Sequence, residues 1–430
     1  MSYKSNISLR SRTLPVLTLV FLILHILSPF EGWLVLLVGF GGAWLCSYFW
    51  VHAVANKLRL RREMRFGWAQ VGDRLEERFT LANLSWLPAP WVEVFDNSTL
   101  PNCQGSRVTG VSGQAENRWT IQSVCTQRGL FTLGPTGLRL TDPLGIYQVR
   151  IEDLNSTSIM VTPPIIQLPE IEVAPGGRTG DGRPRLNALE RTVSASGVRD
   201  FLPGDSLRWI HWPTTARRDE LFVRIFESTP AADWWILLDT DRRVQCGQDP
   251  DSTLEHAITL AASLADRGLR TRHAVGLAAS SDPAVWLPPQ EGDGHRWAIL
   301  RALALVSAAQ LPFRQFLERL KPSLSKYASL ILITPNVSGD WLQTLLPLIR
   351  AGAVPTVLLL DPLSFGGEGD PSSLQSLLVH QGIHHTVITR DLLAQSTSHL
   401  GRQGQWEWRF TPSGKAIAIQ QPSDFTWKEL

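Results

Sequence analysis

The sequence predicts a multi-domain protein with an N-terminal two-helix transmembrane hairpin, a small antiparallel β-sandwich and a C-terminal doubly wound α/β domain. Three observations lead to this prediction. Two apolar runs lie near the N-terminus, short alternating segments separated by turn residues follow them, and the last part alternates apolar strands with amphipathic helices. A chain of 430 residues has room for two or three such domains.

Composition and charge narrow the classes of partner. Hydrophobic residues make up 43% of the chain and charged residues only 19%, which indicates contact with a membrane. The formal net charge of +2 produces no strong field, so we expect no nucleic-acid partner. None of the four cysteines has metal-ligand spacing, and we expect no disulfide in a reducing compartment.

Residues 1–65 are predicted to form the transmembrane hairpin with basic flanks. The run at residues 14–30 carries no charge, and the run at residues 33–55 is long enough to cross a bilayer, which takes roughly 20 apolar residues. A signal peptide is the competing interpretation of the first run, but the second run follows at once. Lysines and arginines lie on both sides of residues 14–55, which predicts a multi-pass protein of the inner membrane with both termini cytoplasmic.

Residues 66–173 are predicted to form the β-sandwich. Segments such as RLEERFTLANLSW and NRWTIQSVCTQ have strand-like composition, and Gly, Pro, Asn and Asp separate them at short spacing. Nothing in this part suggests chemistry, and we interpret Asp142-Pro143-Leu144-Gly145 as a structural turn. Residues 174–186 are rich in Gly and Arg and predict a flexible linker, because a phosphate-binding loop would need a preceding strand and a Lys-Ser/Thr end.

Residues 187–232 hold the densest group of unlike side chains in the chain. Their pattern predicts a strand, a Pro-Gly turn, a short helix after Asp205 and a second strand. Ion pairs such as Asp200 with Arg217 would explain these residues as a structural network. Arginine and tryptophan are also favoured in interfaces, so the alternative is a partner-binding surface. The candidate residues of this segment are Arg199, Asp200, Pro203, Gly204, Asp205, Arg208, Trp212, Arg217 and Arg224.

The same segment carries a family resemblance. GVRDFLPGDSLRWIHWPTTARRDELFVRIFE closely resembles the signature of the domain-of-unknown-function 58 family, and QRGLFTLGPTGLRLTDPLGIY resembles an earlier block of that family. The resemblance implies a membrane-anchored protein whose C-terminal domain is von Willebrand factor A-like. It also implies a MoxR-type AAA+ ATPase as partner, acting in the assembly or maturation of other proteins.

Residues 233–430 alternate strands and helices, which predicts a doubly wound sheet. In the first of these helices Ser252 and Glu255 are expected to form a capping box and Gly268 the C-cap, and residues 406–412 and 415–420 are expected to form an edge hairpin. Ligands of such sheets bind outside the carboxyl ends of the strands, where Asp239, Asp241, Thr334 and Asp361 are expected. By resemblance, Asp239, Asp241 and Thr334 are the candidate metal ligands, and Mg²⁺ is the one cofactor to consider. The family motif, however, has Asp-x-Ser-x-Ser, and here Asp241 and Arg243 replace the two serines. A guanidinium repels a cation.

Two other interpretations of the strand ends remain. A haloacid-dehalogenase-like phosphohydrolase would use Asp239 and Asp241 as nucleophile and general acid, but the lysine and the acidic pair of that family lack counterparts. Alternatively, both aspartates pair with Arg242, Arg243 or Arg217 and have a structural role. We favour the structural role and expect a cytosol-facing interaction protein that is not an enzyme and has no catalytic residues.

Overall fold

The computed structural model describes two compact units, Met1–Pro164 with Leu400–Leu430 and Ile165–His399. Multi-domain organisation is therefore confirmed, with N-terminal helices, antiparallel sheets and a C-terminal α/β sheet that is mostly parallel. The described residues are 3–64, 67–103, 105–153, 155–168, 171–174, 195–201, 210–218, 220–226, 233–324, 328–394, 407–410, 416–420 and 428–429.

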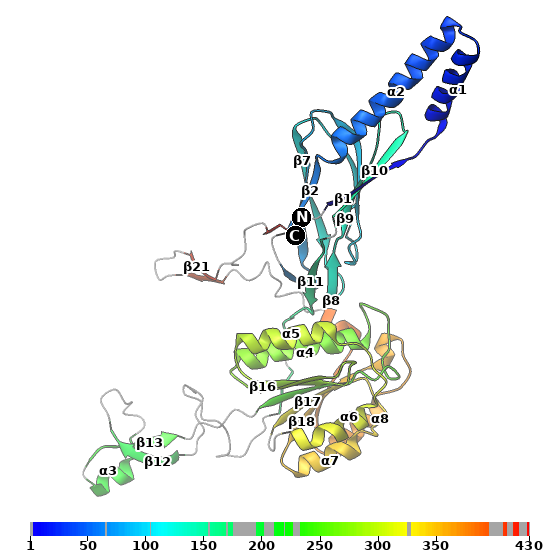
Figure 1. Ribbon diagram of the computed structural model, residues 1–430. Helices are drawn as coiled ribbons and strands as arrows, with labels where there is room; N and C mark the ends of the chain where they lie inside the picture. The colour runs from blue at the N-terminus through cyan, green and yellow to red at the C-terminus, as the bar shows by residue number, and fades with distance from the viewer. Residues whose placement is uncertain are drawn as a thin grey trace. The chain divides into compact units, whose positions relative to one another are not determined.

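The N-terminal apolar runs form two packed helices, α1 (Thr13–Leu27) and α2 (Glu31–Ala55), visible in blue in Figure 1. Phe21 of α1 stacks on Trp33 and Phe40 of α2, with ring centroids 6.0 and 5.4 Å apart. Only α2, among the described helices, is long and apolar enough to cross a membrane. With its 15 residues, α1 is shorter than the length usually needed.

The basic flanks of this hairpin are themselves strands, which the sequence did not predict. β1 (Tyr3–Leu9) pairs antiparallel with β10 (Tyr147–Asp153). β2 (Leu58–Met64) pairs with β4 (Arg74–Asn83) and with β22 (Lys428–Glu429), at the other end of the chain. Both ends of the hairpin therefore continue directly into sheets.

Three sheets build the β-domain of the first unit. Their strand orders are β1-β10-β9-β5-β6, β22-β2-β4-β7 and β3-β11-β8, with all pairings antiparallel except that of β3 with β11. One apolar core takes side chains from the first two sheets, for example Phe79 and Leu138. The remaining strands are β3 (Trp68–Gln70), β5 (Ala89–Asp96), β6 (Arg107–Val111), β7 (Ala115–Val124), β8 (Gly129–Leu133), β9 (Thr136–Thr141) and β11 (Thr157–Thr162).

The last turns of α2 belong to this core. Val51, Val54 and Ala55 are buried among side chains of both sheets. On the same helix, Ser47 donates a hydrogen bond of 2.6 Å to Asp142, which lies in the turn between β9 and β10. Gly145 completes that turn with a left-handed φ of 71°. The turn predicted at Asp142 is confirmed, and it also holds α2 to the β-domain.

The second unit has a six-stranded sheet in the order β16-β15-β14-β17-β18-β19. Five strands are parallel, and β16 (Val285–Gln290), which the sequence pattern did not reveal, is antiparallel to β15. The other strands are β14 (Trp234–Leu238), β15 (Val275–Ala279), β17 (Ser329–Thr334), β18 (Val354–Leu360) and β19 (His384–Ile388). The predicted doubly wound strand–helix alternation is present.

The helices of this unit are α4 (Thr253–Arg270), α5 (Asp293–Leu305), α6 (Phe313–Leu320), α7 (Leu342–Arg350), α8 (Ser372–His380) and α9 (Arg390–Ala394). As predicted, Ser252 caps α4 by accepting from the Glu255 amide. The prediction of Gly268 as a C-cap is wrong, because α4 continues to Arg270. A Cβ at Gly268 would lie 2.8 Å from the Trp234 ring, so close packing explains this glycine.

The predicted C-terminal hairpin is present, as β20 (Glu407–Phe410) paired with β21 (Ala416–Gln420). These strands form a two-stranded sheet of their own and are not an edge of the six-stranded sheet. The strands of the signature segment are also present. β12 (Ala195–Asp200) pairs antiparallel with β13 (Phe222–Phe226). A short helix, α3, lies at Trp212–Arg218, and residues 206–209, where the helix after Asp205 was expected, lie outside the described residues.

Candidate functional site

The candidate site lies where two neighbouring central strands, β14 and β17, end. The strand order reverses direction at this pair, and such a switch point is where open α/β sheets bind ligands. Asp239 directly follows β14, and Thr334 is the last residue of β17. The parallel register therefore brings two of the predicted residues together, although they are 95 positions apart in the sequence.

Asp239 is completely buried and held by two hydrogen bonds. Thr334 Oγ1 donates to one carboxylate oxygen at 2.6 Å, and the backbone N–H of Asp241 donates to the other at 3.0 Å. Burial raises the pKa of Asp239 to about 7, even though both hydrogen bonds favour the charged form. This carboxyl group therefore exchanges its proton near neutral pH.

Asp241 is also buried, but its carboxylate already has a cation. Arg243 donates from Nε to one oxygen at 3.0 Å and from Nη2 to the other at 2.7 Å, which is a bidentate pair. The guanidinium of Arg243 lies largely in solvent, with 65% of its side chain exposed. Of the three arginines proposed as partners for these aspartates, Arg243 is thus a confirmed partner.

These residues do not fit a Mg²⁺ site of the Asp-x-Ser-x-Ser kind. The second candidate ligand, Asp241, is bound by the guanidinium that stands at the position of the last serine. Asp239 has both oxygens in hydrogen bonds with the chain itself. Asp361, the remaining strand-end aspartate, caps the short helix η3 (Pro362–Phe365) by accepting from the Leu363 amide at 3.1 Å.

Several polar residues around the switch point were not predicted. Ser280, after β15, is hydrogen-bonded to Thr240 at 2.8 Å. Asn336 donates its backbone N–H to Thr334 and accepts from the backbone N–H of Ser338 at 2.9 Å, while the Ser338 hydroxyl donates to Asp340 at 2.8 Å. In the sequence, these residues could have been found as short polar side chains that directly follow the apolar strands. Through Thr334, Asn336 is connected to the hydrogen bonds that hold Asp239.

The signature segment is described in part. Trp212 and Arg217 are exposed on α3, and Asp200 is exposed at the end of β12. The backbones of Arg199 and Arg224 pair with β13 and β12 respectively, as predicted. The remaining candidates, Pro203, Gly204, Asp205 and Arg208, lie outside the described residues.

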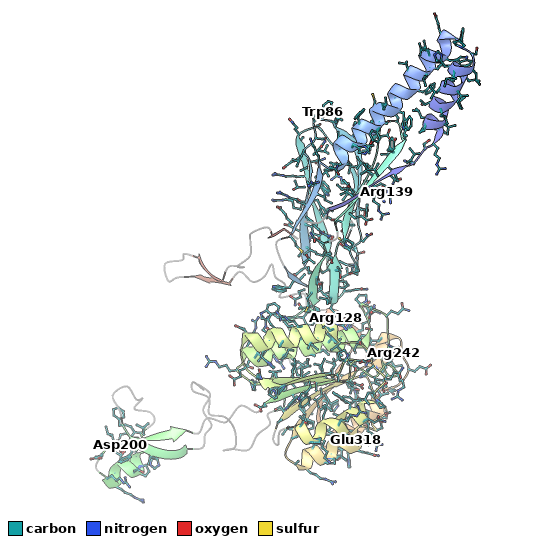
Figure 2. All side chains as sticks on the ribbon, viewed as in Figure 1. Trp86, Arg128, Arg139, Asp200, Arg242 and Glu318 are labelled. Atoms are coloured by element: carbon teal, nitrogen blue, oxygen red, sulfur yellow. The ribbon has the colours of Figure 1, made fainter. Side chains whose placement is uncertain are left out.

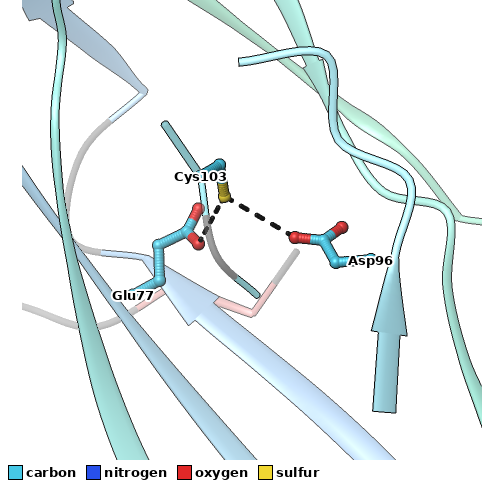
Figure 3. Close-up of side chains that lie close together, drawn as sticks. All are labelled: Glu77, Asp96 and Cys103. Carbon is cyan, nitrogen blue, oxygen red and sulfur yellow. Dashed lines mark hydrogen bonds between the residues drawn. The ribbon is translucent and has the colours of Figure 1, made fainter. Parts of the chain in front are cut away.

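A second polar cluster, missed by the sequence analysis, lies inside the β-domain (Figure 3). Ligand atoms of Glu77, Asp96 and Cys103 lie within 4.8 Å of one another. Arg62 on β2 donates to both oxygens of Glu77, at 2.9 and 3.0 Å, and to Asp96 at 3.2 Å. Since Glu77 is on β4 and Asp96 on β5, the guanidinium joins the two sheets that share the core.

This cluster is better explained as a charge network than as a metal centre. The Arg62 side chain is 5% exposed and Glu77 is fully buried, so the cation and its carboxylates compensate one another inside the domain. Burial, followed by the neighbouring carboxylates, raises the pKa of Cys103 to about 12. A metal needs the thiolate, which this environment disfavours at neutral pH.

Comparison with known proteins identifies part of the chain. Residues 197–364 match the model of the family described as protein of unknown function DUF58. The uncharacterized protein YeaD of Bacillus subtilis (strain 168) is 30% identical over 167 residues, which are 38% of this chain and 39% of that protein. The match thus spans about two fifths of the length of this relative.

Similarity to solved structures is low. An aerotolerance-related membrane protein from Bacteroides fragilis is 16% identical, with a TM-score of 0.29, covering 38% of this chain and 95% of that chain. The CARDB domain of the PF1109 protein from Pyrococcus furiosus is 12% identical, with a TM-score of 0.19, covering 24% of this chain and 94% of that chain.

Proposed function

Because residues 197–364 belong to the DUF58 family, whose function is unknown, we propose a function from the arrangement of the chain's own parts. The protein is a membrane-anchored interaction protein that presents its second unit to other proteins in the cytosol. The observation that carries this proposal is α2. Its first part exposes large apolar side chains such as Val35 and Val38, and its last turns are buried in the β-domain core.

The topology follows from the same helices. In the proposal α1 and α2 both cross the inner membrane, the apolar segment 14–55 contacts the bilayer, and basic residues keep both termini cytoplasmic. The sheets of the first unit are interpreted as a β-sandwich, and the six-stranded sheet as a von Willebrand factor A-like fold. Its strand order and the position of Asp239 support that interpretation.

The proposed partner is a MoxR-type AAA+ ATPase, as the family resemblance implies. The docking face includes α3 of the signature segment, because Trp212 is 65% exposed and Arg217 is exposed on the same short helix. We propose no catalytic role for Asp239 and Asp241. Their carboxylates are held by Thr334, by the Asp241 amide and by Arg243, which supports a structural role.

Co-purification of the full chain from native membranes tests the partner. Replacing Arg208 and Arg217 by Ala is expected to abolish capture of the ATPase while the chain remains in the membrane. Arg314→Ala is the matched control, because Arg314 is another exposed helical arginine of the same unit, paired with Glu318 at 3.2 Å. Equal capture by all variants would reject the docking face. Loss of the chain itself would support the structural network instead.

A metal-dependent binding module is the alternative that one observation favours, namely the contact of 2.6 Å between Asp239 and Thr334. Titration calorimetry of the protein with Mg²⁺ or Mn²⁺ tests it, and we expect no heat of binding. The phosphohydrolase alternative requires a Mg²⁺-dependent phosphatase activity that Asp239→Asn removes. A heat of Mg²⁺ or Mn²⁺ binding, or a phosphatase activity that Asp239→Asn removes, would replace the proposed function.

A further inference from the structure

We propose that the β-domain rests on the lipid surface at the end from which the hairpin emerges, with the turn before β5 in the headgroup layer. We call this end the hairpin-proximal rim and define it by the exposed side chains of Leu84, Trp86, Trp91 and Leu144. The inference rests on the proposed membrane anchoring by α1 and α2, and it adds a second, separate contact with the bilayer.

The strand register places the turn between β4 and β5 beside the base of α2. Leu58, the first residue of β2 after α2, pairs with Asn83, the last residue of β4. The next residue, Leu84, donates its backbone N–H to the Lys57 carbonyl at 3.0 Å. Figure 2 shows Trp86 at this end of the β-domain, close to where α2 joins the sheets.

The turn between β9 and β10 lies at the same end. Ser47 of α2 donates to Asp142 at 2.6 Å, and Trp44 of α2 donates from its indole to the Tyr147 hydroxyl at 2.7 Å. The backbone N–H of Leu144 donates to the same Asp142 carboxylate at 3.1 Å. Leu144 therefore belongs to the rim and lies close to the exit point of the helix.

The exposure of these side chains is high. Trp86 is 71% exposed, Trp91 66%, Leu84 62% and Leu144 55%. Indole rings favour the boundary between headgroups and acyl chains, because one part of the ring is apolar and its N–H can be hydrated. Four large apolar side chains at one end of a domain are typical of a binding surface and unusual for a surface that faces only water.

Several backbone groups of the turn before β5 are already paired inside the β-domain. Asn83 and Ser85, both buried, hold the turn from inside. The Asn83 amide donates to the carbonyls of Leu87 and Ser112 at 2.8 and 3.1 Å, and Ser85 donates its hydroxyl within the turn. Because these carbonyls are already paired, moving the turn out of water costs less.

The length of α2 that stands free of the β-domain indicates that the rim contacts the bilayer. From Trp44 onward α2 contacts the β-domain, so only residues 31–43 stand free of it. At about 1.5 Å per residue this part measures roughly 20 Å. The hydrocarbon layer is about 30 Å thick, so a bilayer crossed by this hairpin reaches down to the rim. Exposed Arg10, Arg12 and Lys57 add attraction to anionic headgroups.

Photo-crosslinking of the full chain tests the inference. The chain would be reconstituted in vesicles of phosphatidylethanolamine and phosphatidylglycerol, with p-benzoylphenylalanine replacing Trp86 or Trp91. The matched control replaces Val124, which is 45% exposed at the opposite end of β7, where it pairs with Arg74. Mass spectrometry after irradiation is expected to find phospholipid adducts at 86 and 91, several-fold above those at 124.

Three results would overturn the inference. The first is equal, low lipid labelling at all three positions in chains that float with the vesicles, because the rim would then face water. The second is crosslinking of position 86 to protein in place of lipid, which would make the rim a protein-docking face. A chain that does not float with the vesicles would overturn the proposed anchoring as well as this inference, so the two failures are distinguishable.

Discussion

The two groups of buried carboxylates differ in how the chain compensates them. In the β-domain, Glu77 and Asp96 share a guanidinium, Arg62, that is buried with them. At the carboxyl end of the central strand β14, Asp241 is paired with Arg243, which is mostly in solvent. Asp239 is held by hydrogen bonds. In the first group the cation and both carboxylates are shielded from water, and their ion pairs connect two sheets. In the second group the pKa of Asp239 is raised to about 7, and the cation that pairs with Asp241 is exposed to water.

Arg62→Met is expected to have the largest effect. It leaves Glu77 and Asp96 buried without their cation, which costs roughly 3–5 kcal/mol of the free energy of unfolding. Guanidinium denaturation of the detergent-solubilised full chain, followed on the β-domain by hydrogen exchange, measures the loss. Adding Glu77→Gln removes one unpaired charge and is expected to recover part of it.

Arg139→Met is the control for Arg62. Arg139 pairs with Glu93 at 3.2 Å, and both side chains are close to half exposed. Surface pairs contribute little, so the expected loss is less than about 1 kcal/mol. Equal losses in the two variants would show that burial of Arg62 does not decide the stability of the β-domain.

Asp239→Asn is expected to stabilise the second unit at alkaline pH. The pKa of Asp239 is raised in the folded state to about 7, so the folded chain holds a proton that the unfolded chain has lost above about pH 4. Stability therefore falls as pH rises from about 4 through 7, and the amide removes this penalty. We expect a gain of roughly 1–4 kcal/mol at pH 8 and little change at pH 4.

Thermal unfolding at pH 4, 6 and 8 checks this prediction. Thr334→Val is the companion variant, because it removes the hydroxyl donor to Asp239 and leaves the carboxyl in place. Destabilisation by Asp239→Asn of equal size at every pH would mean that the charged carboxylate is required. That result would favour the metal-dependent module.

Arg243→Ala is expected to have the smallest effect on stability. Its guanidinium lies in solvent, and water replaces it at the Asp241 carboxylate. The unfolding midpoint should not shift measurably, in contrast to Arg62→Met. If the arginine is what keeps cations away from Asp241, calorimetry will detect Mg²⁺ binding in this variant and none in the wild type. A large loss of stability in Arg243→Ala would show that Asp241 depends on its arginine as strongly as Glu77 and Asp96 depend on Arg62.

Several elements were predictable from local pattern. The capping of α4 by Ser252, the apolar runs of β14 and β17 and the strands of the signature segment were all expected and are present. At the candidate site, Asp239 and Thr334 were chosen because they end apolar strands, and the parallel register does bring them together. Helix α3 was not predicted at Trp212–Arg218, because its Trp-Pro start resembles a turn as much as a helix N-terminus.

Periodicity and run length are properties of short segments, so the amino-acid sequence alone settled the order of the parts: an apolar hairpin, antiparallel strands and an alternating α/β sheet. Contacts between residues far apart in the sequence could be known only from the folded structure. The pairing of β1 with β10, the hydrogen bond from Ser47 to Asp142 and the link from Arg62 to Asp96 depend on which surfaces meet. A charged residue on an alternating strand looks the same whether water or another sheet covers it, and only the packing of the sheets decides which.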